Sequence, residues 1–414
     1  MERNNIRENL LLYIHTFVFL LTIKIPYFVT YTIPALKPFV RYWVLILLIV
    51  TFLIYVTNKG FKIPIDSFLI CGVVWFVIVL TSTILNSGSV IKCIYEFAKI
   101  LSFFILVACY DSKNADMLLK IASVIFTVYL LFNFIFFLIH PNGIRVYEGV
   151  KQLYFGGQAY YFFDSVSESP NYLLTCIATI IISRCFGEQN VILKWIQNII
   201  ILCTLAMLLF INSSTSRVAS ILLVLMIVFH EKLFIIASPK RLTLVFLAVL
   251  LLLVVFNIRE WLSFIIVDIL GEDLSMHGRA GIWEMARGAF LDKPILGYGY
   301  LSDLYHNSVI YKVSAGWYTH SHCEFLEYLL HGGLLGMIPI TIFSYKIIDN
   351  LEYYYKSQRL AQLLTITIFI FLLMSVNETC FTVYFFMIVA IVKNIDIFDE
   401  NICCQETENK SLIF

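Results

Sequence analysis

Residues 115–139 read ADMLLKIASVIFTVYLLFNFIFFLI, and this stretch decides the fold. After Lys120 it carries no charged side chain, so the apolar run that follows has about the 20 residues that a helix needs to cross a membrane. Similar runs recur along the whole chain, and none shows the alternation of apolar and polar residues that is typical of strands. Because lipid cannot satisfy backbone hydrogen bonds, these runs predict transmembrane helices.

The composition of the whole chain supports the same class. Hydrophobic residues make up 60% of the 414 residues and charged residues only 14%, whereas soluble domains contain about 45–50% and about 25%. The net charge is +1 and the basic residues are dispersed between the apolar runs, which argues against nucleic-acid binding. Several of the ten cysteines lie within apolar runs, where they act as small hydrophobes, so no disulfide framework is predicted.

We therefore predict an all-α fold: one polytopic membrane domain, residues 1–414, with about 12 transmembrane helices and no cleaved signal peptide. The predicted spans are residues 10–30, 39–57, 65–85, 91–109, 115–139, 170–186, 191–211, 217–237, 241–258, 325–348, 360–376 and 379–395. The fourth span is the weakest, because Lys92, Glu96 and Lys99 recur in it at helical spacing, as on an ion-paired helix face.

Lysines and arginines in the short loops predict the orientation, because they stay preferentially in the cytoplasm. With Arg3 inside, the basic residues of alternate loops fall on the same cytoplasmic side, and both termini are cytoplasmic. Two long connections, residues 140–169 and 259–324, then face outward. Both are rich in Tyr, Phe, Trp and Gly, which suits segments that fold over a membrane surface and bind a polar, ring-bearing ligand. The inverted repeat of many transporters is missing.

Outward arginines are informative because positive charge is otherwise kept inside. Arg217 follows Ser216 at the mouth of a predicted span, where a guanidinium beside hydroxyl groups suits a phosphate at the membrane surface. The alternative is an arginine whose stem lies along the helix end while its charged head reaches water.

A short helix is predicted in the second long connection, over residues 277–290. Lys293-Pro294 ends this helix, and Gly297-Tyr298-Gly299 forms a turn. Arg279 lies in the first helical turn, where the positive end of the helix dipole and the guanidinium can share an anion. Arg145 and Arg287 are two further arginines on the predicted outward side.

Two histidines precede the next predicted span. His322 lies at the outer mouth of the helix, close to Glu324 and Glu327, and can serve as a general base because the pKa of histidine lies near working pH. The pair His320 and His322 can instead bind a metal ion, although no third ligand stands out nearby. A purely structural role for the histidines is the third interpretation.

The order of these motifs resembles the O-antigen ligase and polymerase superfamily over roughly the C-terminal half of the chain. The motifs are Ser169-Pro170-Asn171, Ser216-Arg217, Gly278-Arg279 with Ile282-Trp283, Lys293-Pro294-Ile295-Leu296-Gly297-Tyr298-Gly299, and His322 with Leu326 and Gly333-Leu334-Leu335-Gly336. The spacing of the leucine and the glycines selects His322 over His320, and over the rival pair His306-Asn307. The family histidine is usually followed by Asn, and Cys323 stands there in this chain. Arg145 and Gly156 resemble an arginine-to-glycine spacing of some O-antigen polymerases.

The resemblance implies inverting, metal-independent glycosyl transfer from an undecaprenyl-diphosphate-linked sugar chain, in the fold of the lipid-dependent integral membrane glycosyltransferases, with no cofactor. It implies that Arg217 and Arg279 hold the diphosphate, with Ser216, Arg145 or Arg287 beside them. His322 would then take the proton of the acceptor hydroxyl. The implied location is the cytoplasmic (inner) membrane, with the active site facing the periplasm.

The resemblance implies two functions that differ in the acceptor of the glycan. A polymerase joins the glycan to another lipid-linked repeat unit, and we favour it because the segment 293–297 is well matched. A ligase joins the glycan to lipid A core or another acceptor. A flippase for lipid-linked oligosaccharide is a lesser alternative, because the arginines lie at helix mouths instead of around a site in mid-membrane. The expected partners are the undecaprenyl-diphosphate-linked oligosaccharide and membrane lipid, with a chain-length regulator as a further candidate.

Overall fold

The computed structural model describes most of the chain. The described residues are 2–61, 66–146, 158–186, 190–211, 213–229, 232, 237–256, 258–261, 263–269, 279–301, 310 and 320–398. The predicted rival histidine His306, together with Gly156 and Gly278, lies outside these residues.

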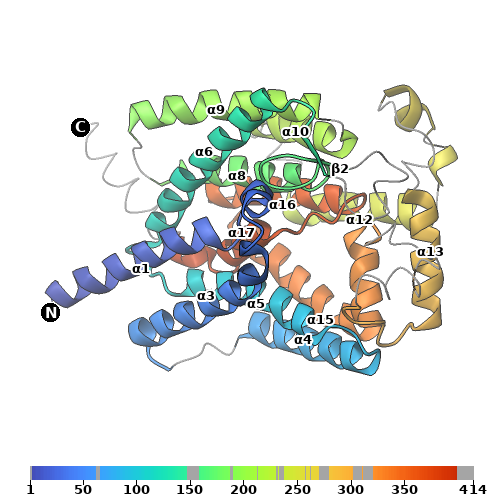
Figure 1. Cartoon of the computed structure of the whole chain (residues 1–414), viewed down its shortest axis with the longest axis horizontal. Helices are drawn as coiled ribbons and strands as arrows, with labels where there is room; N and C mark the ends of the chain where they lie inside the picture. The colour runs from blue at the N-terminus through green and yellow to red at the C-terminus, as the bar shows by residue number, and fades with distance from the viewer. Residues whose placement is uncertain are drawn as a thin grey trace.

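Helices dominate the described part of the chain (Figure 1). The first half contains α1 (Glu2–Thr22), α2 (Tyr27–Thr32), α3 (Leu36–Lys59), α4 (Ser67–Leu85), α5 (Val90–Ala108) and α6 (Ala115–Ile139), followed by a hairpin of β1 (Ile144–Val146) and β2 (Gln158–Tyr160). The second half contains α8 (Ser169–Ser183), α9 (Val191–Phe210), α10 (Ser214–Val228), α12 (Pro239–Leu250), α13 (Arg279–Asp292), α15 (Glu324–Tyr354), α16 (Arg359–Ser375) and α17 (Val383–Lys393).

These helices confirm the all-α membrane class. Each predicted span falls on a helix, and α6 has the predicted bounds. Within the described residues, five helices are long and apolar enough to cross a membrane, namely α3, α4, α6, α9 and α15. Several others, among them α8, α10, α16 and α17, are apolar but shorter. The count of about 12 transmembrane helices therefore stays a prediction.

Two predicted spans need correction. The span 10–30 is interrupted, because α1 ends at Thr22 and α2 begins only after Pro26, whose ring removes a backbone donor and disfavours a continuous helix. In the span 241–258 the helix changes its type: α12 ends at Leu250, and a π-helical turn, Leu251–Val255, continues it directly.

The core of the bundle lies around α8, α16 and α17. Every residue of α8 except Ile181 is buried, and α16 and α17, drawn in red, pass through the middle of the molecule (Figure 1). Outer helices instead expose large apolar side chains: on α9, Trp195, Leu202 and Phe210 are 65%, 67% and 77% exposed. Such apolar exposure suits contact with lipid, because only a hydrocarbon surrounding removes its cost.

Helix α15 is broken at Gly333, where φ is 59° and ψ is −160°. The segment 294–299 lies against the break and supplies the hydrogen bonds that the helix loses there. Tyr298 N–H donates to the carbonyl of Leu330 at 2.6 Å, and Leu334 N–H donates to the carbonyl of Pro294 at 2.8 Å. Irregular backbone is tolerated at membrane depth only where protein or water satisfies it. The family-like motif at residues 293–299 therefore has a structural role.

The same segment also binds α4. Tyr300 N–H donates to Thr83 Oγ1 at 2.9 Å, and Ser89 N–H donates to the carbonyl of Tyr300 at 2.7 Å. Gly299 has φ of +67°, and a Cβ there would lie 2.3 Å from the backbone nitrogen of Thr83. Only glycine fits so close to another backbone. This contact ties the C-terminal end of α4 to the connection between α13 and α15.

Candidate functional site

Three segments that are distant in sequence meet at the carboxylate of Glu378, in the link between α16 and α17. Arg279, at the start of α13, donates from Nη1 to the carbonyl of Asn377 at 2.6 Å and from Nη2 to Glu378 Oε1. His322, in the turn before α15, places Nδ1 3.2 Å from Glu378 Oε2. The sequence predicted Arg279 and His322 as site residues, and the structure brings both to one carboxylate.

Burial distinguishes the carboxylate from its two partners. The side chain of Glu378 is only 4% exposed, whereas those of Arg279 and His322 are 17% and 23% exposed. A buried carboxylate without partners would cost several kcal/mol, about 3–5 when one partner of a buried pair is removed. Glu378 therefore needs both neighbours. It lies behind them, and the arginine and the histidine are the groups that a ligand can reach.

The backbone of His322 adopts a left-handed conformation, with φ of 53°. This costs a residue with a side chain roughly 1–2 kcal/mol, although histidine occurs there more often than most residues. His322 N–H donates to His320 Nδ1 at 3.3 Å, and the two imidazole rings lie 4.0 Å apart at 66°. His320 thus supports the turn that presents His322.

The two acids of the first turn of α15 hold the loops that carry the site. Glu327 accepts a hydrogen bond from the backbone N–H of Ser321, directly before His322. Glu324 Oε1 accepts from the backbone N–H of Phe381 at 2.9 Å, three residues after Glu378. Both carboxylates therefore have partners in the backbone, which favours a positioning role over a chemical one.

Cys323, where the family usually has Asn, is fully buried at the start of α15. Burial raises the pKa of its thiol to about 12, so the group stays protonated at working pH. The hydroxyl of Ser321 donates to the carbonyl of Cys323 at 3.0 Å and so supplies a local hydrogen bond in this turn. The thiol therefore packs as a small apolar side chain in this turn.

The start of α10 lies beside the Glu378 segment. Asn377 Nδ2 donates to Thr215 Oγ1 at 3.0 Å, which places Arg217 two residues from a contact with that segment. Arg217 Nε donates to the carbonyl of Leu209 at 3.2 Å. The hydroxyl of Ser216 is buried and donates to the carbonyl of Ser213 at 2.7 Å, a bond within the helix start. Substrate binding by Arg217 and Ser216 stays a prediction.

The other two predicted arginines contact different elements. Arg287 Nη1 donates to the carbonyls of Val254 and Val255, both at 3.1 Å, at the end of the π-helical turn. Arg145 is exposed in β1, opposite Ala159 of β2. These contacts give Arg287 a helix-capping role and place Arg145 on the hairpin, so their binding of a diphosphate stays a prediction.

Sequence reasoning missed Glu378 and Asn377. The available signal was an acid in the short link between the last two predicted spans, on the side where outward arginines lie. Two buried polar atoms near Arg279 also make no hydrogen bond: Oδ1 of Asn377 and Nε1 of Trp283, one helical turn after Arg279.

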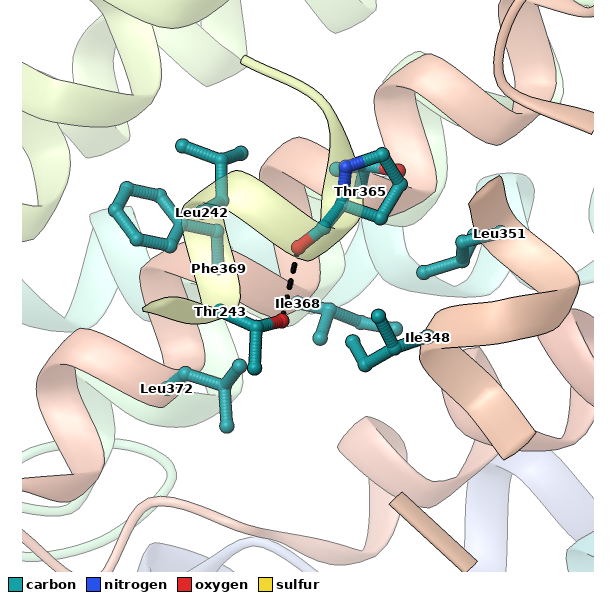
Figure 2. A pocket seen from close by; sticks show the side chains of 9 residues that line it. Leu242, Thr243, Ile348, Leu351, Thr365, Ile368, Phe369 and Leu372 are labelled. Carbon is teal, nitrogen blue, oxygen red and sulfur yellow. Dashed lines mark hydrogen bonds between the residues drawn. The ribbon is translucent and has the colours of Figure 1, made fainter. Parts of the chain in front are cut away.

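A small pocket elsewhere does not suit a charged ligand (Figure 2). It lies between α12, α15 and α16, and its described lining is apolar apart from Thr243 and Thr365. Thr243 Oγ1 donates to the carbonyl of Pro239 at 2.8 Å, and Thr365 Oγ1 to that of Ala361 at 2.7 Å. For a metal ion, the described residues offer no group of three or more His, Cys, Asp or Glu side chains in suitable positions.

One comparison with known families covers part of the candidate site. Residues 199–341 match the family described as O-Antigen ligase, and this range contains Arg217, Arg279 and His322, whereas Glu378 lies beyond it. No curated protein sequence gives a significant match. Over residues 199–341 the chain is therefore similar to the O-antigen ligase family.

Proposed function

We propose that the chain is a glycosyltransferase that moves a glycan from undecaprenyl diphosphate to an acceptor hydroxyl, with inversion at the anomeric carbon and without a metal ion. The observation that carries this proposal is the meeting of Arg279 and His322 at the buried carboxylate of Glu378. A cation for a leaving diphosphate and a base for an acceptor hydroxyl stand side by side there, and both are partly exposed.

The chemistry needs these two groups. The acceptor oxygen attacks the anomeric carbon and forms the new glycosidic bond, while the bond between that carbon and the diphosphate oxygen breaks. The acceptor proton passes to His322, and the electron pair of the broken bond leaves on the diphosphate. A diphosphate is a stable anion, so it needs guanidinium donors and no general acid.

Arg279 supplies the nearest guanidinium, and Arg217 supplies a second one from the start of α10. The bond between Asn377 and Thr215 brings that start beside the Glu378 segment. Arginine suits this task because its planar fork can bind two phosphate oxygens at once. The orientation predicted from the lysines and arginines places this site on the periplasmic side of the inner membrane, where lipid-linked glycans are presented after flipping.

The acceptor separates two forms of the proposal. The polymerase form, in which a second lipid-linked repeat unit accepts the chain, was favoured by the match at residues 293–297. That segment repairs the break in α15 and is needed whatever the acceptor is. The ligase form, with lipid A core or another surface molecule as acceptor, is favoured by the description of the matched family.

The test is turnover by the purified protein in lipid. With a lipid-linked repeat unit alone, a polymerase yields a ladder of longer chains and free undecaprenyl diphosphate. A ligase yields product only when lipid A core is added. Movement of the lipid-linked unit across a vesicle, with no new glycosidic bond and no diphosphate released, would show a flippase and overturn the proposal.

A further inference from the structure

The two oxygens of Glu378 have different partners. Oε1 accepts from Arg279 Nη2, and Oε2 faces His322 Nδ1 at 3.2 Å. With the carboxylate as acceptor, Nδ1 of His322 carries the proton and Nε2 keeps the lone pair for the acceptor hydroxyl. One buried negative charge is therefore shared between the proposed diphosphate-binding group and the proposed base.

We propose that Glu378 makes the base strength of His322 depend on whether a diphosphate occupies Arg279. This inference rests on the proposed function and deepens it. Without donor, the guanidinium of Arg279 offsets the charge of Glu378, so the carboxylate stabilises an imidazolium only weakly. When a diphosphate binds Arg279, it competes with Glu378 Oε1 for the Nη2 donor, and Glu378 then has His322 as its main charged partner and bonds it more strongly.

The consequence is an order of events. An imidazolium beside a carboxylate is stabilised, because an opposite charge within about 4–6 Å favours the charged form. Donor binding therefore raises the pKa of His322 and makes it a stronger base for the acceptor. Before the donor is bound, His322 is a weaker base and less able to activate water. The acceptor is thus activated only when the leaving group is already in place.

Other charged and titratable groups also face His322. His320 lies against its ring, Glu327 holds the preceding residue, and Glu324 holds the loop of Glu378. Glu327 and Glu324 lie on α15 and accept hydrogen bonds from backbone groups of Ser321 and Phe381, so a diphosphate at Arg279 does not replace their partners. Their influence on His322 stays the same with and without donor, whereas that of Glu378 changes.

The experiment measures the pKa of His322 in the full chain in nanodiscs, with and without undecaprenyl diphosphate. Proteins labelled with carbon-13 at the histidine rings are titrated by NMR, and the His322 signal is assigned as the one that His322→Gln removes. In the wild type, undecaprenyl diphosphate is expected to raise the pKa by about one unit. In Glu378→Gln the increase is expected to fall to the smaller, direct effect of the diphosphate charge.

Two further variants keep the inference falsifiable if Glu378→Gln does not fold. In Arg279→Gln the pKa of His322 is expected to be raised already without ligand, because nothing offsets Glu378. Glu327→Gln is the matched control, a nearby acid that does not contact Arg279, and it should keep the full ligand response.

The outcomes separate the inference from the proposed function. Failure of undecaprenyl diphosphate to bind the wild type would contradict the proposed function itself. Binding that leaves the pKa of His322 unchanged, or an increase in Glu378→Gln equal to that of the wild type, would overturn the coupling alone. An unaltered pKa in ligand-free Arg279→Gln would also overturn it.

Discussion

Glu324 Oε1 accepts a hydrogen bond from the backbone N–H of Phe381 at 2.9 Å, across 57 positions of sequence. The bond joins the first turn of α15 to the loop that carries Glu378. Since the turn before α15 carries His322, the carboxylate of Glu324 helps to hold His322 and Glu378 at a fixed distance from each other.

The first prediction separates this positioning role from acid–base chemistry at Glu324. Glu324→Gln keeps an oxygen that can accept from Phe381, so its kcat should stay within about threefold of the wild type. Glu324→Ala removes the acceptor and should lower kcat at least about tenfold, as expected when a hydrogen bond worth about 1.5–3 kcal/mol is lost. Steady-state kinetics decide between the roles. If Gln and Ala lower kcat equally, with an altered pH profile, Glu324 takes part in the chemistry.

The second prediction concerns the break in α15. A Cβ on Gly333 would lie 2.3 Å from the carbonyl oxygen of Ile295, at a left-handed φ of +59°. Gly333→Ala should therefore destabilise the protein by at least about 2 kcal/mol. Gly336→Ala is the matched control, because its Cβ would meet Trp75 and Ile78 only at 3.9 Å. Thermal unfolding in detergent measures both, and equal melting temperatures would contradict the packing described for residues 294–299.

The third prediction compares the two neighbouring histidines. His322→Ala should lower turnover about 10²- to 10⁴-fold, the range for loss of a positioned base. His320→Ala should cost less, because His320 supports the turn that presents His322 through its Nδ1. Binding of the lipid-linked donor should survive in both variants.

A chelator added to the wild-type assay tests the metal alternative for the same histidines. Loss of activity on chelation, restored by a divalent ion, would replace the base with a metal site at His320 and His322. Small and equal losses in the two alanine variants, without any effect of chelator, would leave both histidines structural.

The fourth prediction concerns arginine geometry. Arg217→Lys should raise KM for the donor or lower kcat at least about tenfold, because a bidentate fork becomes a point charge. Arg287→Lys tests the other predicted diphosphate-binding arginine, whose contacts favour a structural role. Since Arg287 bonds the carbonyls of Val254 and Val255, its replacement should reduce the melting temperature while the folded fraction keeps its kcat. Wild-type kinetics of Arg217→Lys would remove the diphosphate-binding role of Arg217.

The helices could be predicted from the sequence, but the places where their regular geometry changes could not. A long apolar run such as residues 115–139 has one stable backbone form in lipid, so its helix could be predicted with its bounds. The gap between Thr22 and Tyr27 and the π-helical turn after Leu250 depend on neighbouring packing, which hydropathy does not record. The break at Gly333 was likewise hidden, because the residues that repair it lie in a loop.

The candidate site was predictable in part. Motif order and register selected Arg279 and His322, yet Glu378 was missed because it approaches His322 across 56 positions of sequence. The packing of the helices decides which links meet at one end of the bundle. This packing cannot be read from a single sequence. The match at residues 293–297 favours a polymerase when the sequence is taken alone. The structure gives the same segment another role, because its backbone bonds across the break in α15.

The repaired break in α15 bears on how the protein is made. The turns of this helix around Gly333 gain their full set of hydrogen bonds only after the loop at residues 294–299 is in position, and that loop is held by Thr83, 217 positions before Tyr300. Helix α15 is synthesised long after α4, and its broken part is completed only when the loop packs against α4. The matched segment 199–341 contains the loop that repairs the break but lacks Thr83, so in that segment alone the loop loses one of the contacts that hold it.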